Sequence, residues 1–394
     1  MSNPNGAQSL RRVIDVIREN GSISRRGIAE STGLSTPSIT RLVNELIDAQ
    51  ILQVVGSSEQ PAAGPGRPAS SVTFNPLFGS SIGVDVGEHT IRAAIGDMGG
   101  KIQLTRQARL ERGDGQKSFD CLADLIREIR KQFESDFDEA VPPLRAITVC
   151  VPGTVDPNSS VVKQAPNIPG WKDFPIKELL QKEFPSIHVR IENDVNAAAI
   201  GEWAYGRAQG KDNFVFVSFR GGIGAGVFIN GQLFRGHGGF AGEVGKLVFD
   251  PGFAYSDAAG LGHFETLASE GPVIAKAISA GVKLESAGES PQLKDLCVAA
   301  DRGDPAALAI LDEALDHHSV AIANIACLFD PELIVIGGEL NAILDMAVEK
   351  IRKRARQLVP FDPQIEGAAL GEQSGLRGAF YQAHKDCCET LTLK

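Results

Sequence analysis

The chain has 394 residues, 43% hydrophobic and 22% charged, with 43 Gly and 21 Pro. This composition excludes collagen-like, disulfide-scaffolded and wholly disordered chains, and the length predicts two or three domains. Thirty-nine basic against 49 acidic residues give a net charge of −10, without the basic surplus typical of nucleic-acid binders. No apolar run is long enough to span a membrane and no signal-peptide core opens the chain, so we expect a cytoplasmic protein.

The six cysteines are scattered along the chain and form no CxxC pair. Adjacent thiols such as Cys387 and Cys388 do not easily chelate one metal together. This usage indicates a reducing compartment and no zinc site built from cysteines. The six are Cys121, Cys150, Cys297, Cys327, Cys387 and Cys388.

Residues 8–55 are predicted to form three short helices. The first carries apolar residues at helical spacing from Leu10 to Ile17 and stops at Asn20-Gly21. The second covers about 24–31 and ends in Thr32-Gly33, and the third begins with Thr36 as N-cap and Pro37 at the first helical position. Helix, glycine turn and helix are typical of a helix-turn-helix. The apolar face of the third helix holds Ile39, Leu42, Val43, Leu46 and Ile47.

The stretch 51–55, a Gly/Pro-rich segment at 56–70 and residues 72–74 predict a two-stranded wing. With the apolar residues inside, short hydroxyls and arginines remain on the outward face, where they suit phosphate and base-edge contacts. A lone arginine in a narrow Gly-Arg-Pro loop suits a minor groove, although it could equally be a generic linker arginine. A three-helix bundle for protein contacts is the alternative. The candidate DNA contacts are Arg25, Arg26, Ser35, Thr36, Ser38, Thr40, Arg41 and Arg67.

The acidity of the chain belongs to its larger, C-terminal part. Residues 1–74 hold seven arginines, no lysine and six acids, a charge of +1, which leaves −11 for the remainder. The net charge therefore does not argue against a DNA-binding head. Such a head must rely on placed arginines and dimerisation more than on bulk charge.

After residue 76, short strands alternate with helices, which indicates an α/β fold. Strands are expected at 81–86, 91–95, 101–107, 146–151, 188–191, 214–219 and 333–336, and helices at about 118–133 and 195–201. Hairpin turns are expected at Gly99-Gly100 and Asn230-Gly231. Glycines follow several strand ends, where such folds bind ligands.

Seven motifs between residue 80 and the C-terminus occur in one order: IGVDVG, VPGTVD, APNIPGW, ENDVNAAAIGEWAYG, GGIGAGVFINGQLFRG, AGEVG and DPELIVIGG. In this order the chain resembles the ROK family of repressors, open reading frames and sugar kinases, and with its head it resembles the repressor branch. The resemblance implies an actin-like fold of two α/β lobes with sugar and nucleotide in the cleft between them. We expect a head at 1–75, an N-lobe at 76–192 and a C-lobe at 193–394, whose last helix can return to the N-lobe.

The resemblance also implies a sugar site. In family kinases the position of Asp194 is the general base, and that of Asn193 binds the sugar. Asn167, Glu243 and Glu265 match further hydroxyl contacts. From the residues alone, Asp194 is equally an N-cap of the helix that follows, and a carboxylate–amide pair binds a diol without catalysis. The other three would, in isolation, be surface acids and a turn asparagine.

The nucleotide loops depart from the family pattern. The first reads Asp85-Val86-Gly87-Glu88-His89, with a carboxylate where phosphate would lie. The second, Arg220–Gly224, lacks the usual threonine. We therefore expect weak or no ATP binding, the alternative being that Arg220 replaces the lost donors with a cation. The vestigial loop residues are Asp85, Gly87, Gly222, Gly224, Gly337 and Gly338.

The family zinc motif is absent too. Lys246 stands where the family has a zinc-ligating histidine, and Ser256, Ala258 and His263 stand at its cysteine positions. Since a structural zinc needs four N or S ligands, we expect no metal. The Lys246 ammonium is predicted to pair with Glu243 or Asp194, or to meet an anionic ligand such as a sugar phosphate.

These observations predict a sugar-responsive transcriptional regulator, most simply a repressor. A homodimer or homotetramer would place two heads on a palindromic double-stranded operator, and a sugar or sugar derivative would bind the degenerate cleft without catalysis. One alternative is an active ATP-dependent sugar kinase with an appended DNA-binding domain, in which Asp194 is catalytic. Another is a protein-docking body without a small ligand.

Overall fold

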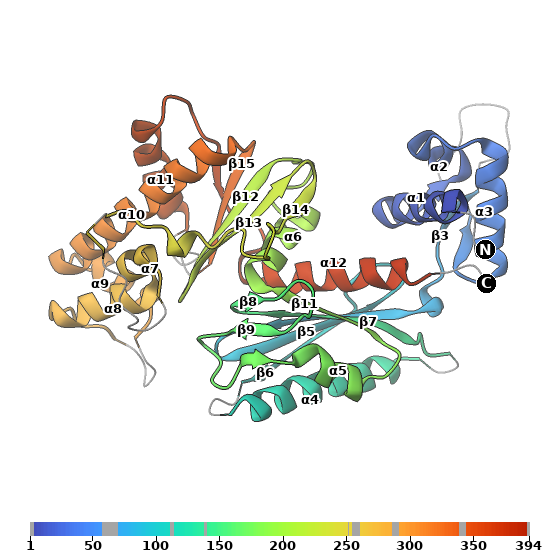
Figure 1. Cartoon of the computed structure of the whole chain (residues 1–394), viewed down its shortest axis with the longest axis horizontal. Coiled ribbons are helices and arrows are strands. Elements are labelled where there is room, and N and C mark those ends of the chain that lie inside the picture. Colours follow the sequence, from blue (N-terminus) through green and yellow to red (C-terminus); the bar gives the residue numbers. More distant parts are fainter. Residues whose placement is uncertain are drawn as a thin grey trace. The chain divides into compact units, whose positions relative to one another are not determined.

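The computed structural model describes residues 4–56, 70–110, 114–137, 140–250, 252–253, 261–285, 291–338 and 344–391. The chain divides into two units (Figure 1). Unit 1 comprises Met1–Cys150, Phe174–Ile191 and Ala379–Lys394, and unit 2 comprises Val151–Asp173 and Glu192–Gly378. Within the part of the chain so described, no helix is both long and apolar enough to cross a membrane.

The head of unit 1 contains the three predicted helices, α1 (Pro4–Asn20), α2 (Arg25–Thr32) and α3 (Thr36–Asp48). The turns after α1 and α2 contain Gly21 and Gly33 at positive φ, where glycine carries no steric cost. The predicted N-cap of α3 is wrong by one residue. Ser35, not Thr36, holds the cap position and accepts the amide of Ser38, because either hydroxyl residue can cap and the sequence does not say which.

The predicted wing is present. Strands β2 (Leu52–Val55) and β3 (Ser71–Phe74) pair antiparallel, and a short strand that the sequence did not reveal, β1 (Ile23–Ser24), pairs with the other edge of β3. The head also packs on the rest of unit 1. Arg18 donates a hydrogen bond to the Tyr381 hydroxyl at 2.7 Å, and the rings of Phe74 and His384 meet edge to face.

The body of unit 1 is a five-stranded sheet in the order β11-β7-β4-β5-β6. Helices α4 and α5 cover one face, and the unit 1 part of α12 lies along the other (Figure 1). Phe380, on α12, is fully buried. The elements are η1 (Pro76–Phe78), β4 (Ser80–Val86), β5 (Thr90–Asp97), β6 (Leu104–Arg109), α4 (Gly115–Glu134), β7 (Leu144–Val151), α5 (Ile176–Glu183), β11 (His188–Asn193) and α12 (Ser374–Glu389).

Unit 2 is built on a second five-stranded sheet, in the order β14-β13-β12-β15-β16, and its helices from α7 to α11 share one large apolar core with β12, β13 and β15. A small sheet, β10-β9-β8, adjoins it in sequence. The elements are β8 (Thr154–Val155), β9 (Val162–Gln164), β10 (Lys172–Phe174), α6 (Asp194–Tyr205), β12 (Phe214–Phe219), β13 (Ile223–Ile229), β14 (Gln232–Phe234), η2 (Val244–Lys246), α7 (His263–Ala268), α8 (Glu270–Ser279), α9 (Leu293–Asp301), α10 (Pro305–Phe329), β15 (Leu333–Gly338), α11 (Leu344–Leu358), β16 (Ile365–Gly367) and η4 (Gly371–Gln373).

The two sheets share one topology. In each, three consecutive strands form an antiparallel meander (β4-β5-β6 and β12-β13-β14), and the next strand of the sheet (β7 and β15) pairs parallel with the first. The first hairpin of each sheet therefore contains one of the two predicted nucleotide loops. The fold confirms the predicted α/β class, and Asn230 and Gly231 both have positive φ, as a type I′ turn requires.

Candidate functional sites

The outward face of α3 presents the hydroxyl groups that the sequence singles out. Ser35 and Ser38 lie with their Oγ atoms 2.9 Å apart at the start of the helix. Thr40 Oγ1 donates to the Thr36 carbonyl at 2.9 Å, and Thr36 and Thr40 are exposed. These hydroxyls serve the helix locally and keep acceptor lone pairs toward solvent.

The candidate arginines of the head have weak local partners. Arg26 pairs with Glu30 at 2.8 Å and Arg41 with Glu45 at 2.7 Å, both four residues apart on an exposed helix surface. Arg25 instead reaches α3, where it donates to Asn44 Oδ1 at 3.0 Å. Exposed pairs of this kind contribute only about 0.3–0.5 kcal/mol, so an incoming phosphate can displace the acid. The predicted contact Arg67 lies outside the described residues.

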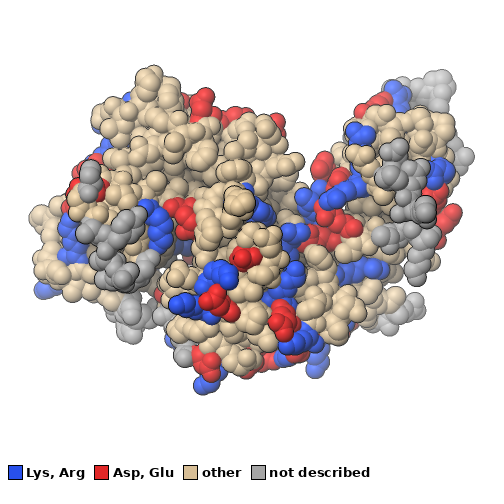
Figure 2. Space-filling model, in the orientation of Figure 1, with Lys and Arg blue, Asp and Glu red and all other residues tan. Residues whose placement is uncertain are grey.

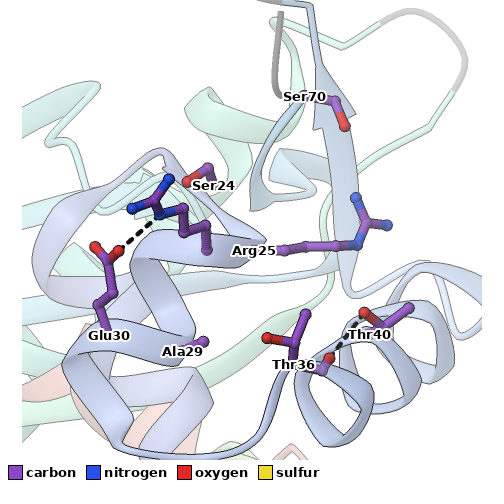
Figure 3. A pocket seen from close by; sticks show the side chains of 8 residues that line it. Ser24, Arg25, Ala29, Glu30, Thr36, Thr40 and Ser70 are labelled. Atoms are coloured by element: carbon purple, nitrogen blue, oxygen red, sulfur yellow. Dashed lines mark hydrogen bonds and ion pairs between the residues drawn. The ribbon is translucent and has the colours of Figure 1, made fainter. Parts of the chain in front are cut away.

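A shallow hollow lies between α2, α3 and the start of the wing strand (Figure 3). Arg26 pairs with Glu30 on the same helix, whereas Arg25 extends away from that helix (Figure 3). The hollow therefore gathers hydroxyl and guanidinium donors from two helices. It is lined by Ser24, Arg25, Arg26, Ala29, Glu30, Thr36, Thr40 and Ser70.

Bulk charge adds little to this local arrangement. Blue and red side chains are interspersed over the face shown in Figure 2, in keeping with a net charge of −10. Long-range attraction to a polyanion grows with net positive charge, so any DNA contact depends on the placed residues of the head.

In unit 2, Asn193 caps α6. Its Oδ1 accepts the amide of Asn196 at 2.9 Å, and its Nδ2 donates to the Gly153 carbonyl at 2.9 Å and to Asp194 Oδ1 at 3.1 Å. The alternative assignment of Asp194 as the N-cap is therefore wrong. Asp194 is the first residue of α6, where the helix dipole favours a carboxylate.

The segment that leads to Asn167 packs against Gly153, the residue whose carbonyl Asn193 contacts. Gly153 has φ of +110° and lies so close to Gln164 that a Cβ there would be 2.0 Å from the Gln164 carbonyl oxygen, which only glycine permits. Asn167 follows in a turn closed by the Ile168 amide bonding to the Ala165 carbonyl. Gln164 thus lies against Gly153, whose carbonyl Asn193 contacts, and the Asn167 turn follows Gln164 in the chain.

Glu265 is the centre of a second cluster, on α7. Its buried carboxylate accepts the amides of Ile223 at 3.1 Å and Gly262 at 2.7 Å, and the Lys246 ammonium at 2.9 Å. Lys246 therefore pairs with Glu265, a partner that the sequence did not indicate. The reason is that η2 returns Lys246 to the N-terminus of α7, a proximity that no sequence pattern shows.

Glu243 belongs to the same cluster through its charge. Partial desolvation by the surrounding protein raises the pKa of this carboxyl group, Lys246 opposes the shift, and the nearby Glu265 carboxylate adds to it. The cluster therefore contains the Glu265 carboxylate and the Lys246 ammonium, which form an ion pair, and the Glu243 carboxyl group, whose pKa is raised. Such a set donates and accepts hydrogen bonds without a large net charge, which suits the hydroxyls of a neutral ligand.

Sequence reasoning missed Glu192 and Arg235. Glu192 is 4% exposed at the end of β11 and accepts both terminal nitrogens of Arg235, at 2.7 and 2.5 Å. An acid directly after the strand predicted at 188–191 was the available signal, since a buried carboxylate needs a cation. The sequence does not show which cation this is, because Arg235 lies 43 residues away from Glu192.

The nucleotide loops have internal partners. In unit 1, Asp85 is buried opposite Arg92 on β5, with 3.9 Å between Asp85 Oδ2 and Arg92 Nη1. The amide of Gly87 bonds to the Thr90 carbonyl. In unit 2, the Ile223 amide of the second loop is taken by Glu265. The Asp85 carboxylate thus faces the Arg92 cation, and the Glu265 carboxylate accepts the Ile223 amide. A bound phosphate would need groups of these two kinds.

The remaining vestigial glycines differ in how closely the protein surrounds them. A Cβ on Gly222 would lie 3.4 Å from Glu265 Oε1, one on Gly224 would lie 3.1 Å from Val195, and one on Gly337 would lie 2.7 Å from the Phe216 ring. Gly338 ends β15 at φ of +97°. A side chain would therefore clash at Gly337, whereas Gly222 is exposed and has only an ordinary van der Waals neighbour.

The residues at the family zinc positions do not fit a zinc site. Lys246 is bound to Glu265, and His263 Nδ1 accepts the Phe249 amide at 3.0 Å while its ring stacks on Phe253. Ser256 and Ala258 lie outside the described residues. Among residues that the structure does describe, no group of three or more His, Cys, Asp or Glu is placed to hold a metal.

A winged helix-turn-helix head on a two-unit α/β body with sugar-kinase-like, actin-related topology defines the class of protein. A winged helix-turn-helix DNA-binding model matches residues 8–53, and the ROK family model matches residues 81–386. The chain belongs to the ROK family. Its resemblance to the repressor branch is confirmed by the relatives below.

The xylose repressor of Bacillus spizizenii is 30% identical over 87% of this chain and 85% of that protein. The crystal structure of a ROK family transcriptional regulator, described as a homolog of the Escherichia coli MLC protein, aligns with a TM-score of 0.80 and 25% identity over 98% of both chains. A ROK family glucokinase from Streptomyces griseus, in complex with glucose and AMPPNP, aligns with a TM-score of 0.66 and 28% identity over 77% of this chain and 99% of the glucokinase.

Proposed function

We propose that the chain is a sugar-responsive transcriptional repressor that binds double-stranded DNA through its head and a neutral sugar through unit 2. One observation carries the proposal: the chain combines a winged helix-turn-helix head with a ROK body, an arrangement that spans nearly the whole length of a ROK transcriptional regulator. The glucokinase relative lacks a counterpart for about a quarter of this chain.

In the head, α3 would enter the major groove with Ser35, Thr36, Ser38, Thr40 and Arg41 toward base edges and phosphates. Arg25 and Arg26 would contact the backbone from α2, and Arg67 would reach a minor groove. A homodimer or homotetramer would present two heads to a pseudo-palindrome whose half-sites lie about one helical turn apart.

In unit 2, Asn167, Asn193 and Asp194 would bind sugar hydroxyls from one side, and Glu243, Lys246 and Glu265 from the other. Because Glu265 already compensates the Lys246 ammonium at 2.9 Å, a neutral sugar is favoured over a sugar phosphate. The relatives are named for xylose and glucose, so only the class of ligand carries over. The sugar must bind one arrangement of the repressor better than another to release DNA.

The test is fluorescence anisotropy with the full chain and labelled DNA from its own promoter, repeated with xylose, glucose, N-acetylglucosamine and glucose 6-phosphate. We expect sequence-specific binding that one neutral sugar weakens several-fold to about a hundredfold, the usual range of allosteric coupling. Failure to bind promoter DNA better than random DNA contradicts the proposal. Tighter binding of the phosphate than of every neutral sugar contradicts the assignment of ligand class.

The second candidate is an ATP-dependent sugar kinase, favoured by the glucokinase relative and by Asp194 at the N-terminus of α6. Against it stand the Asp85–Arg92 pair and the use of the Ile223 amide by Glu265. ATP turnover with the same sugars separates the two. Sugar phosphorylation that is lost in Asp194→Asn would establish the kinase.

A further inference from the structure

Three of the proposed sugar-binding residues, Asn193, Asp194 and Glu243, lie on two segments of unit 2, and one ion pair joins these segments. The first segment contains Asn193 and Asp194 at the start of α6. The second runs from Arg235 through four glycines to Glu243. Glu192 directly precedes the first segment, and its partner Arg235 begins the second.

Arg235 and Glu192 form a bidentate ion pair, which we call the clasp. Both terminal nitrogens of Arg235 bond to the two carboxylate oxygens of Glu192, a bidentate arrangement that restricts direction as well as distance. Glu192 Oε1 also accepts the Asn193 amide at 3.0 Å and Asn196 Nδ2 at 3.3 Å. One buried carboxylate thus holds the first turn of α6 and the start of the glycine-rich segment at once.

The segment that Arg235 begins has little intrinsic rigidity. Gly236, Gly239 and Gly242 all have positive φ, between +71° and +91°, and glycine loses more conformational freedom on ordering than any other residue. The Ala241 amide bonds to the Arg235 carbonyl at 3.2 Å, and the Gly242 carbonyl accepts the Ala225 amide at 2.7 Å. The position of Glu243 therefore depends on anchors at the two ends of the segment.

We propose that Arg235 is a positioning residue for the sugar site: through Glu192, it fixes the distance between the Asn193–Asp194 pair and the Glu243 carboxyl group. This inference rests on the proposed sugar-binding function of unit 2. A fixed separation between two hydrogen-bonding groups selects ligands by the spacing of their hydroxyls. The Arg235–Glu192 pair thus acts on affinity and on discrimination between sugars without touching the DNA-reading head.

The test compares four variants of the full chain with wild type. Arg235→Met removes the clasp, Arg235→Met/Glu192→Gln removes it without leaving a buried carboxylate unpaired, and Arg235→Lys keeps the charge but not the fork. Arg356→Met is the matched control, because Arg356 forms a bidentate pair with Asp362 on the surface of the same unit. Each variant is measured by calorimetric sugar binding, promoter binding without sugar, and hydrogen exchange of the Ala241 and Glu243 amides without sugar.

We expect the double variant to bind sugar at least about tenfold more weakly and to discriminate less between sugars. Its Ala241 and Glu243 amides should exchange about tenfold faster or more, and its promoter binding should equal that of wild type. Arg235→Lys should fall between wild type and the double variant, and Arg356→Met should match wild type. This pattern supports a positioning role, since a general loss of structure would change promoter binding too.

Wild-type sugar affinity and wild-type exchange in the double variant overturn the inference and leave the proposed function intact. Conversely, a wild-type chain that binds none of the sugars defeats the proposed function, and the exchange measurement then decides the inference alone. Faster exchange in the double variant supports the clasp, and unchanged exchange overturns it.

Discussion

The head and the unit 2 site hold their candidate binding groups in opposite ways. In the head, Arg26 and Arg41 lie exposed beside acids on their own helices, with side chains 87% and 63% accessible. In unit 2, Glu192 and Glu265 are buried, and each meets a cation and backbone amides at short distance.

The difference follows from the size and charge of the proposed ligands. A duplex offers a repeating array of phosphates and repays the ordering of flexible arginines through many contacts and counterion release. A sugar offers few contacts, so its binding groups must be held in place before it arrives. Substitutions in the head should therefore change DNA affinity with little effect on stability, and those in unit 2 should change stability as well.

The largest expected effect is that of Glu265→Ala on the stability of unit 2. The substitution removes the acceptor of the buried Ile223 and Gly262 amides and one partner of the half-exposed Lys246 ammonium. Each buried amide left without an acceptor costs about 1–3 kcal/mol. Urea unfolding followed by tryptophan fluorescence measures it, because the two tryptophans, Trp171 and Trp203, both belong to unit 2.

Glu366→Ala is the control for this comparison. Glu366 pairs with Arg207 at the surface, with 46% of its side chain accessible, so its loss should change the unfolding free energy by less than about 0.5 kcal/mol. If Glu265→Ala unfolds at the same urea concentration as Glu366→Ala, the claim that the unit 2 site is preorganised is wrong.

The next largest effect is a loss of stability in mild acid, carried by one buried histidine in each unit. Burial lowers the pKa of His318 in unit 2 and of His384 in unit 1 from 6.5 to about 4. Below pH 6.5 these imidazoles are protonated in the unfolded chain but remain neutral in the folded chain. The free energy of unfolding is therefore fully present above pH 6.5 and falls as the pH drops toward 4. Each histidine should account for about 2 kcal/mol between pH 7 and pH 5.

Unfolding at pH 7 and pH 5 in His318→Gln and His384→Gln assigns these losses. Tryptophan fluorescence should lose pH dependence in His318→Gln, and the circular dichroism transition of unit 1 should lose it in His384→Gln. Exposed His237→Gln serves as control and should follow the wild-type curves. Equal pH dependence in all four proteins would refute the assignment to buried histidines.

The third effect concerns DNA affinity. Arg41→Ala should weaken promoter binding about tenfold and reduce the salt slope by about one, with stability unchanged because its pair with Glu45 is exposed. Glu45→Ala frees Arg41 from its acid and should bind DNA as tightly as wild type or tighter. Weaker binding in Glu45→Ala would mean that the pair is needed to orient the arginine and that the head is preorganised after all.

Local signals predicted most of the fold, and contacts distant in sequence explain what they missed. The helix periods, the Asn230-Gly231 turn and the C-terminal ends of β4, β7 and β12 depend on neighbouring residues, and the structure confirms them. The strand expected at 101–107 is displaced and runs over Leu104–Arg109. The pairings of Lys246 and Arg235 depend on how loops return, which no spacing encodes. Capping was missed by one residue at Ser35 and again at Asn193, because neighbouring residues were equally able to cap.

The smallest effect tests that last ambiguity. Asn193 caps α6 through Asn196, so Asn193→Ala should cost about 1 kcal/mol of stability. Asp194→Ala should cost less, about 0.5 kcal/mol, because Asp194 contributes through the helix dipole. Trp203 lies on α6 itself, and its fluorescence during urea unfolding reports both. Asn193→Asp retains a capping oxygen and should unfold near wild type while losing the donor to the Gly153 carbonyl. A larger loss in Asp194→Ala than in Asn193→Ala would return the cap to Asp194 and leave Asn193 free to serve the ligand alone.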